Sequence, residues 1–124
     1  MIVFYIAVFG ALGCLSRYYL QGWVYNIVGG VIPYGTLTVN VLGAFIIGLV
    51  MQLGLSSELI SADLRTGLTI GFLGGMTTFS TFSYETFRLF EDGEMFFALL
   101  NIFGSVSLCI LFTWCGYLVA RYLL

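Results

Sequence analysis

Charged side chains occupy only a few short stretches of this chain, and long, largely apolar stretches without charge separate them. The uncharged stretches cover residues 1–16, 18–57, 66–84 and 95–120. A helix needs about 20 apolar residues to cross the hydrocarbon core of a membrane, and the second stretch is long enough for two crossings with a turn between them. The pattern therefore predicts an all-α membrane protein with four transmembrane helices, in a single domain over residues 1–124.

The residues between these stretches predict where each helix ends. Pro33 and the glycines beside it interrupt the long second stretch, because proline and neighbouring glycines break a helix. Asp63, at the end of a polar segment, is expected to cap the third helix, and an acidic turn over residues 91–94 precedes the fourth. We expect helices over residues of about 2–25, 36–53, 64–90 and 95–121.

The third predicted helix carries small and hydroxyl residues near its middle, where a simple membrane anchor would carry leucines. Residues 74–83 read GGMTTFSTFS, and adjacent glycines and threonines favour a break in the helix. A break exposes carbonyl and amide groups that hydrocarbon cannot satisfy, so such backbone is buried in protein, lines water or binds an ion such as sodium. Phe79 and Phe82 project from similar faces after the break. Their electropositive ring edges could hold an anion weakly, as conduction requires, although packing explains most phenylalanines.

Two further polar features lie inside the apolar stretches. Asn40 is on the second helix, where a buried amide is costly unless it is hydrogen-bonded, so a bond between helices is its simplest explanation. On the fourth helix, polar side chains recur at every fourth position and share a face: Asn101, Ser105, Cys109 and Thr113. A lone Ser or Thr usually bonds to its own helix, whereas a stripe offers a series of weak donors across the membrane.

The composition excludes several classes of protein. The chain is 60% hydrophobic and 8% charged, whereas soluble proteins have about 25% charged residues. It has no histidine, and its three cysteines are scattered, so we expect neither a zinc site nor histidine-based catalysis. No basic cluster favours nucleic acid. We therefore expect neither an enzyme nor a nucleic-acid-binding protein.

The four arginines do not specify which way the chain faces. Arg65 and Arg121 fall on one side of a four-pass protein, and Arg17 and Arg88 fall toward the other, whereas orientation follows an excess of Lys and Arg on one side. One hypothesis is dual topology, in which the chain inserts both ways and pairs as an antiparallel homodimer. The alternative is a single orientation set by a weak bias.

Four helices enclose too little space for a polar conduit, so transport would require partner subunits. Small residues at four-residue spacing, such as Gly67, Gly71 and Gly75, let helices approach closely in lipid. That spacing fits packing within one chain as well as between copies.

Three segments together resemble the CrcB/Fluc family of fluoride channels. They are GALGCLSRY over residues 10–18, GTLTVNVLGAFIIG over 35–48 and GGMTTFSTFSYE over 74–85. The resemblance covers essentially the whole chain. It implies passive, fluoride-selective export from the cytoplasm, through two pores in an antiparallel, dual-topology homodimer in a microbial plasma membrane, with a bacterial inner membrane favoured.

The resemblance also implies roles for individual residues. It places the fluoride pathway on Asn40, Phe79, Ser80, Thr81, Phe82, Ser105, Cys109 and Thr113. Arg17 would lie at the vestibule, and the backbone carbonyls of Gly74 and Thr77 would bind a structural sodium ion at the dimer interface, two from each chain. Cys109 departs from the family pattern, which has a serine there, and a thiol is a weaker donor than a hydroxyl.

A small proton-coupled multidrug exporter is the main alternative, because such exporters are also short four-helix, dual-topology dimers. They need a carboxylate in mid-membrane, usually in the first helix, but here that helix holds Arg17 and no acid. A non-transporting assembly subunit would explain the glycine spacing but not the broken third helix. Glu85 lies one turn after Phe82, and we expect it to pair with Arg88 at i+3 or to face a wet vestibule.

Overall fold

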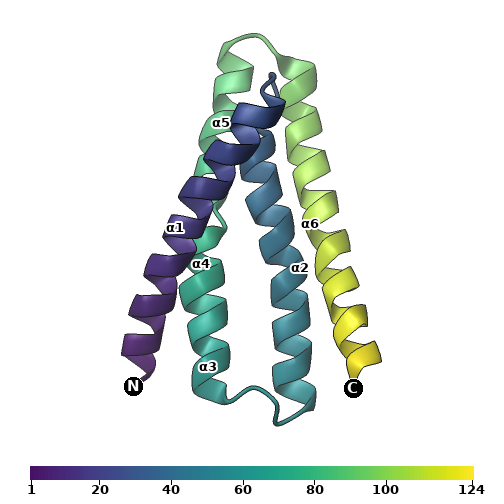
Figure 1. Ribbon diagram of the computed structural model, residues 1–124. Coiled ribbons are helices and arrows are strands. Elements are labelled where there is room, and N and C mark those ends of the chain that lie inside the picture. The colour runs from purple at the N-terminus through teal and green to yellow at the C-terminus, as the bar shows by residue number, and fades with distance from the viewer.

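The computed structural model describes residues 1–124 as a set of helices joined by short connections (Figure 1). Three helices run the length of the molecule: α1 (Ile2–Val28), α2 (Tyr34–Ser56) and α6 (Met95–Leu123). Each of the three is long and apolar enough to cross a membrane. Together with a divided third pass they fit the four predicted crossings, and every pass extends slightly beyond the predicted bounds.

The third pass is broken where the run of glycine, threonine and serine predicted a break. Its pieces, in chain order, are α3 (Ala62–Thr66), η1 (Gly67–Leu73), α4 (Gly74–Met76) and α5 (Phe79–Glu91). Thr77 and Thr78 have extended backbones, with φ −82°, ψ 155° and φ −151°, ψ 114°. The segment η1 is π-helical, which the sequence pattern did not predict; such wide turns often occur next to functional sites.

The residue that caps the third pass differs from the one predicted. Asp63 does not cap α3, because it lies within the first turn. The cap is Ser61, whose extended backbone lets its hydroxyl oxygen accept a hydrogen bond from the Leu64 N–H at 3.3 Å. Asp63 instead places a negative charge near the helix N-terminus, where the helix dipole favours it.

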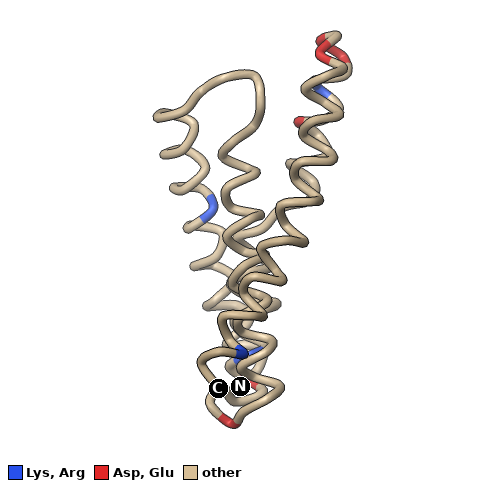
Figure 2. The backbone as a smooth tube through the Cα atoms, turned by 90° about the vertical axis from the view of Figure 1, so that its right-hand side faces the viewer, with Lys and Arg blue, Asp and Glu red and all other residues tan.

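Both termini and the α2–α3 connection lie at one end of the molecule, and the α1–α2 and α5–α6 connections lie at the other (Figure 1). Basic residues lie toward both ends of the chain's fold (Figure 2). Arg65 lies in the last turn of α3 and Arg121 in that of α6, near the termini, whereas Arg88 lies in the last turn of α5, at the opposite end. The positive charge is therefore divided between the two ends, as predicted.

The helices pack through glycines and leave most large apolar side chains on the outside. The first half of the third pass packs against α1, and α2 packs along α6. A Cβ atom at Gly13 would overlap the backbone of Phe72, and one at Gly48 would overlap the backbone of Thr113. Only 20 of the 124 residues are buried. This exposure suits a chain whose surroundings are lipid, where close backbone packing replaces a hydrophobic core.

Candidate functional site

A groove of about 580 Å³ lies beside the break in the third pass, with α2 and α6 as its other walls. Most of the site residues predicted from the sequence line it: Asn40, Gly74, Thr77, Phe79, Phe82, Ser105, Cys109 and Thr113. No charged side chain lines this groove. Residues from three of the four passes thus line one uncharged, partly polar groove.

The side-chain amide of Asn40 hydrogen-bonds both backbone groups of Thr78 at the break. Its Nδ2 donates to the Thr78 carbonyl at 3.1 Å, and its Oδ1 accepts from the Thr78 N–H at 2.8 Å. These two bonds replace helical bonds that the extended residues cannot make. One amide hydrogen of Asn40 is left over, and Asn40 lines the groove.

The break also frees backbone carbonyl oxygens. Because the Thr78 N–H bonds to Asn40, the Gly74 carbonyl loses the donor that an unbroken helix would give it. The Thr77 carbonyl accepts no hydrogen bond within the chain, since the Thr81 N–H is bonded to the Thr78 hydroxyl at 3.1 Å. Gly74 and Thr77 both line the groove, so hard oxygen ligands are available there for a cation such as sodium.

The two predicted aromatic residues are close together but differently exposed. The ring centroids of Phe79 and Phe82 are 5.4 Å apart, and the ring planes are inclined by 44°. Phe82 is 8% exposed, whereas Phe79 is 76% exposed. Phe82 is therefore held by this chain, and Phe79 reaches outward from the groove without a neighbour that covers it.

Ser80 and Thr81 do not line the groove. The Thr78 hydroxyl lies 2.9 Å from the Thr81 hydroxyl and 3.3 Å from that of Ser80. Successive helical residues are rotated by about 100°, so two residues between Phe79 and Phe82 point elsewhere. Thr81 lines a second cavity, and Ser80 is exposed.

The two hydroxyl groups that α6 brings to the groove are bonded within the chain. The Thr113 hydroxyl donates to the Cys109 carbonyl at 2.9 Å, and the Ser105 hydroxyl donates to Asn101 Oδ1 at 3.3 Å. Asn101 belongs to the same stripe but is buried behind the groove, and its Nδ2 donates to the Thr86 hydroxyl at 2.9 Å. The stripe therefore divides into three groove-lining residues and one that connects α6 to α5.

A second cavity, of about 490 Å³, lies between α1, the α1–α2 connection and α5. Across it, Gln21 Nε2 donates to the Thr36 hydroxyl at 3.0 Å, and that hydroxyl donates to Glu85 Oε1 at 2.9 Å. Glu85 Oε2 is buried without a hydrogen-bond partner. Neither Gln21 nor Thr36 was predicted as a site residue, although Gln21 carries the same sequence signal as Asn40, a lone amide within an apolar stretch.

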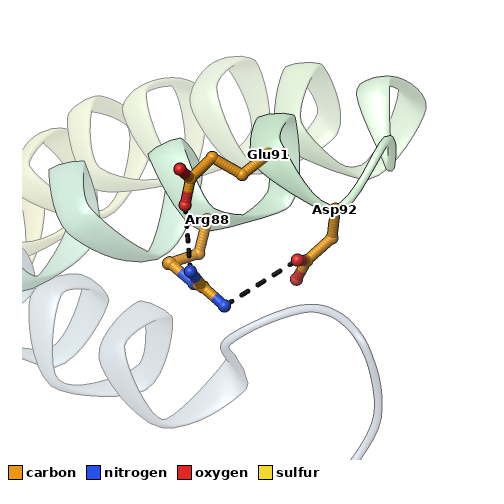
Figure 3. Close-up of polar contacts among 3 residues, drawn as sticks. All are labelled: Arg88, Glu91 and Asp92. Carbon is orange, nitrogen blue, oxygen red and sulfur yellow. Dashed lines mark hydrogen bonds and ion pairs between the residues drawn. The ribbon is translucent and has the colours of Figure 1, made fainter.

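Of the two expectations for Glu85, the pairing with Arg88 is wrong. Arg88 instead pairs with Glu91 at 2.9 Å and with Asp92 at 3.8 Å (Figure 3). Arg88 lies in the exposed last turn of α5 and reaches the acidic residues that follow it, whereas Glu85 turns toward Thr36 on α2.

Arg17 lies apart from both cavities. It is half-buried on α1 and makes neither an ion pair nor a hydrogen bond within the chain. The sequence-based prediction of a vestibule role for Arg17 therefore stays a prediction.

Comparison with known proteins gives consistent matches over nearly the whole chain. Residues 4–117 match the family model described as CrcB-like protein, Camphor Resistance (CrcB). A protein of Geotalea daltonii named fluoride-specific ion channel FluC is 64% identical over 121 residues, which are 98% of each chain. Proteins of the same name from Geotalea uraniireducens and Geobacter metallireducens are 66% and 64% identical, over 96% and 95% of each chain.

Proposed function

The chain belongs to the CrcB family, and on this premise we propose that it is a passive, fluoride-selective channel through which fluoride leaves the cytoplasm. It is a multi-pass membrane protein, and we place it in a microbial plasma membrane, the inner membrane of a bacterium. The names of its relatives support the choice of ion. The observation that carries the proposal is the uncharged groove beside the broken third pass.

The lining of the groove suits a small, strongly hydrated anion. Such an ion needs many modest donors in place of its water, because a single fixed cation would hold it too tightly for conduction. The remaining amide hydrogen of Asn40 and the ring edges of Phe79 and Phe82 provide donors of this kind. In this proposal Ser105, Cys109 and Thr113 continue the path along α6, and Ser80 and Thr81 contribute outside the groove.

We propose that the functional unit is an antiparallel homodimer with two pores. Phe79 is 76% exposed although it lines the groove, so a second copy is a natural cover for it. The division of positive charge between the two ends supports insertion in both orientations. A single cysteine introduced at Glu94 of a cysteine-free variant tests this: reagents on each side of the membrane should each label part of the protein. Labelling from one side alone would exclude dual topology.

We propose that a sodium ion binds at the dimer interface through the backbone carbonyls of Gly74 and Thr77. The free carbonyl oxygens at the break fit this ion, because they are hard, uncharged ligands. A bound sodium ion would supply positive potential near the anion path without a titratable group. In this chain, Asn40 keeps the Gly74 carbonyl free by taking the Thr78 N–H, and the Thr78 hydroxyl keeps the Thr77 carbonyl free by taking the Thr81 N–H.

Fluoride efflux from liposomes tests the proposed function. Purified protein is reconstituted into liposomes loaded with fluoride or chloride, and a potassium ionophore balances the charge. We expect rapid fluoride loss with chloride retained, and no dependence on a proton gradient. Protein-free liposomes are the control.

Failure of fluoride to leave liposomes that contain inserted dimers would exclude the channel. Flux that requires a proton gradient would instead favour the small exporter, with Glu85 as its carboxylate. No observation in the structure favours that alternative.

A further inference from the structure

A buried series of hydrogen bonds joins α5 to α6 behind the groove. The Thr86 hydroxyl donates to the Phe82 carbonyl at 2.7 Å, Asn101 Nδ2 donates to the Thr86 hydroxyl at 2.9 Å, and the Ser105 hydroxyl donates to Asn101 Oδ1 at 3.3 Å. Thr86, Asn101 and Ser105 are 5%, 3% and 7% exposed. At one end of the series lies Phe82, and at the other lies Ser105, both of which line the groove.

The direction of every bond in this series follows from its first member. The Phe82 carbonyl can only accept, so the Thr86 hydroxyl gives its one proton there and must accept from Asn101. The amide nitrogen of Asn101 therefore faces Thr86, and its oxygen faces Ser105. Ser105 consequently gives its proton to Asn101 and presents only lone pairs to the groove, which repel an anion.

The bonds differ in length, and the difference decides which of them can open. Hydroxyl hydrogen bonds are usually about 2.7–2.8 Å long, so the bond of Thr86 is at its best length, whereas the 3.3 Å bond of Ser105 is stretched. A hydrogen bond to a charged acceptor is about twice as strong as one between neutral groups. An anion in the groove can therefore replace Asn101 Oδ1 as the acceptor of the Ser105 hydroxyl's hydrogen bond, while the bonds to Thr86 and Phe82 stay in place.

We propose that Asn101 is a positioning residue for the anion path, with two separate effects. Through Thr86 it fixes the backbone of Phe82 against α6. Through its Oδ1 it accepts the hydrogen bond of the Ser105 hydroxyl until an anion in the groove replaces it as the acceptor. This inference rests on the proposed function, since it assumes that fluoride enters the groove.

Selective labelling tests the second effect directly. The chain has three asparagines, at positions 26, 40 and 101, so asparagine labelled with ¹⁵N in its side chain gives three pairs of side-chain amide signals, each pair sharing one ¹⁵N resonance. During a fluoride titration of the dimer in detergent, we expect the Asn101 signal to move and that of exposed Asn26 to stay fixed. In Ser105→Ala the Asn101 signal should no longer respond, because the relay is gone. An Asn101 signal that ignores fluoride in the wild type, or that still responds in Ser105→Ala, would overturn the proposal.

Variants of Thr86 test the first effect. Thr86→Val removes the hydroxyl at nearly constant volume, and Thr86→Ser keeps it. Loss of one buried hydrogen-bonded link should lower fluoride flux per assembled dimer about tenfold in Thr86→Val, with Thr86→Ser close to the wild type. Ser83→Ala is the matched control, because the Ser83 hydroxyl also bonds to a carbonyl one turn back, Phe79, but is exposed and reaches no other helix.

Equal flux in Thr86→Val and Thr86→Ser would overturn the positioning of Phe82, whatever their thermal stabilities. The two readouts also separate this inference from the proposed function. Flux in the wild type with a silent Asn101 signal refutes only the inference. A responding Asn101 signal without flux refutes only the channel, and leaves an anion-binding groove in which Asn101 holds the proton of Ser105.

Discussion

The two halves of the third pass are held in place by different forces. The half before the break, comprising α3, η1 and α4, packs against α1, and glycines bring the backbones together. A Cβ atom at Gly75 would lie 2.6 Å from the Gly10 carbonyl oxygen. The half after the break, α5, makes no helix contact with α1. It is bonded through side chains to α2 and α6 instead, as by Thr36 to Glu85 and Asn101 to Thr86.

This difference places the two proposed ion sites on different kinds of support. The carbonyls of Gly74 and Thr77 belong to the end of the glycine-packed half, which has little freedom to shift because backbone touches backbone. Phe79 and Phe82 belong to the hydrogen-bonded half, whose position depends on a few specific donors and acceptors. The proposed cation site and the proposed anion path then meet at one break. Substitutions that add bulk should disrupt the first half, whereas substitutions that remove a hydrogen bond should disrupt the second.

The largest effect should come from adding a methyl group on α1 where it packs against the glycine-packed half. At Gly13 a Cβ atom would overlap the Phe72 backbone, which cannot rotate away. Overpacking usually costs about 1–3 kcal/mol and occasionally more, and because this contact is with rigid backbone we expect the upper part of that range, so Gly13→Ala should yield little assembled protein by size-exclusion chromatography. Gly22→Ala, on the same helix with no atom near its Cβ position, should assemble normally. Normal assembly of Gly13→Ala would show that α1 does not depend on this contact.

The next effect should come from the junction of the two halves. Asn40→Leu leaves the Thr78 N–H and carbonyl without partners, and because the groove admits water the two together should cost about 2 kcal/mol. We expect a lower thermal midpoint and loss of flux. Gln52→Leu is the control, because Gln52 bonds only to Ser56 on its own helix. If both variants had the same midpoint, Asn40 would not hold the break closed.

Local features of the fold could be predicted from the sequence, whereas pairings between distant residues could not. The break after residue 76 follows from adjacent glycines and threonines, and the stripe on α6 follows from a spacing of four residues. The partner of Asn40 is Thr78, 38 positions away, and no periodicity encodes that distance. Glu85 shows the same limit, because the local i+3 rule offered Arg88 as a partner, one of two expectations, and the fold gives it Thr36.

Many of the residues that line the groove could be predicted from the sequence, but their hydrogen-bond partners could not. Spacing and resemblance selected residues on three passes that the fold brings together. The bond between helices expected for Asn40 is present, but the sequence did not identify Thr78 as its partner or show that the Ser105 hydroxyl is bonded to Asn101, because both depend on exact neighbours. The glycine-packed half is thus easier to predict than the hydrogen-bonded half, since small residues leave a repeating pattern and single bonds do not.

Replacing an aromatic residue of the hydrogen-bonded half should leave dimer assembly intact and reduce fluoride flux. Phe82→Ile removes a ring edge, and aromatic contacts are worth about 0.5–1.5 kcal/mol, so fluoride flux per assembled dimer should fall by up to about tenfold. Phe87→Ile is the control on the same helix, because Phe87 is 56% exposed and lines neither cavity. Unchanged flux in Phe82→Ile would remove that ring from the mechanism.

Withdrawal of sodium should lower the thermal stability of the dimer, because the proposed sodium ligands lie at the end of the glycine-packed half. Replacing sodium with the bulky cation N-methylglucamine removes a ligand that binds only the folded dimer, and such linkage is worth about 1 kcal/mol when sodium exceeds its dissociation constant several-fold. We expect the thermal midpoint to fall by a few degrees and to recover when sodium is restored. Asn40→Leu should lose this response, since the amide that holds the break, and with it the carbonyls of Gly74 and Thr77, is then gone. A midpoint independent of sodium in the wild type would exclude the proposed ion site.

The smallest effect should come from Cys109, which lines the groove together with residues of both halves but holds neither in place. Its thiol makes no hydrogen bond in the structure and is a weak donor. Cys109→Ser adds a stronger donor at the same position, although a serine in a helix also bonds to its own carbonyl one turn back. These tendencies oppose each other, so fluoride efflux should rise by no more than about twofold. Cys115→Ser, on the same helix and outside the groove, should leave efflux unchanged. A tenfold change in Cys109→Ser would mean that donors on α6, rather than the two halves of the third pass, set the rate of conduction.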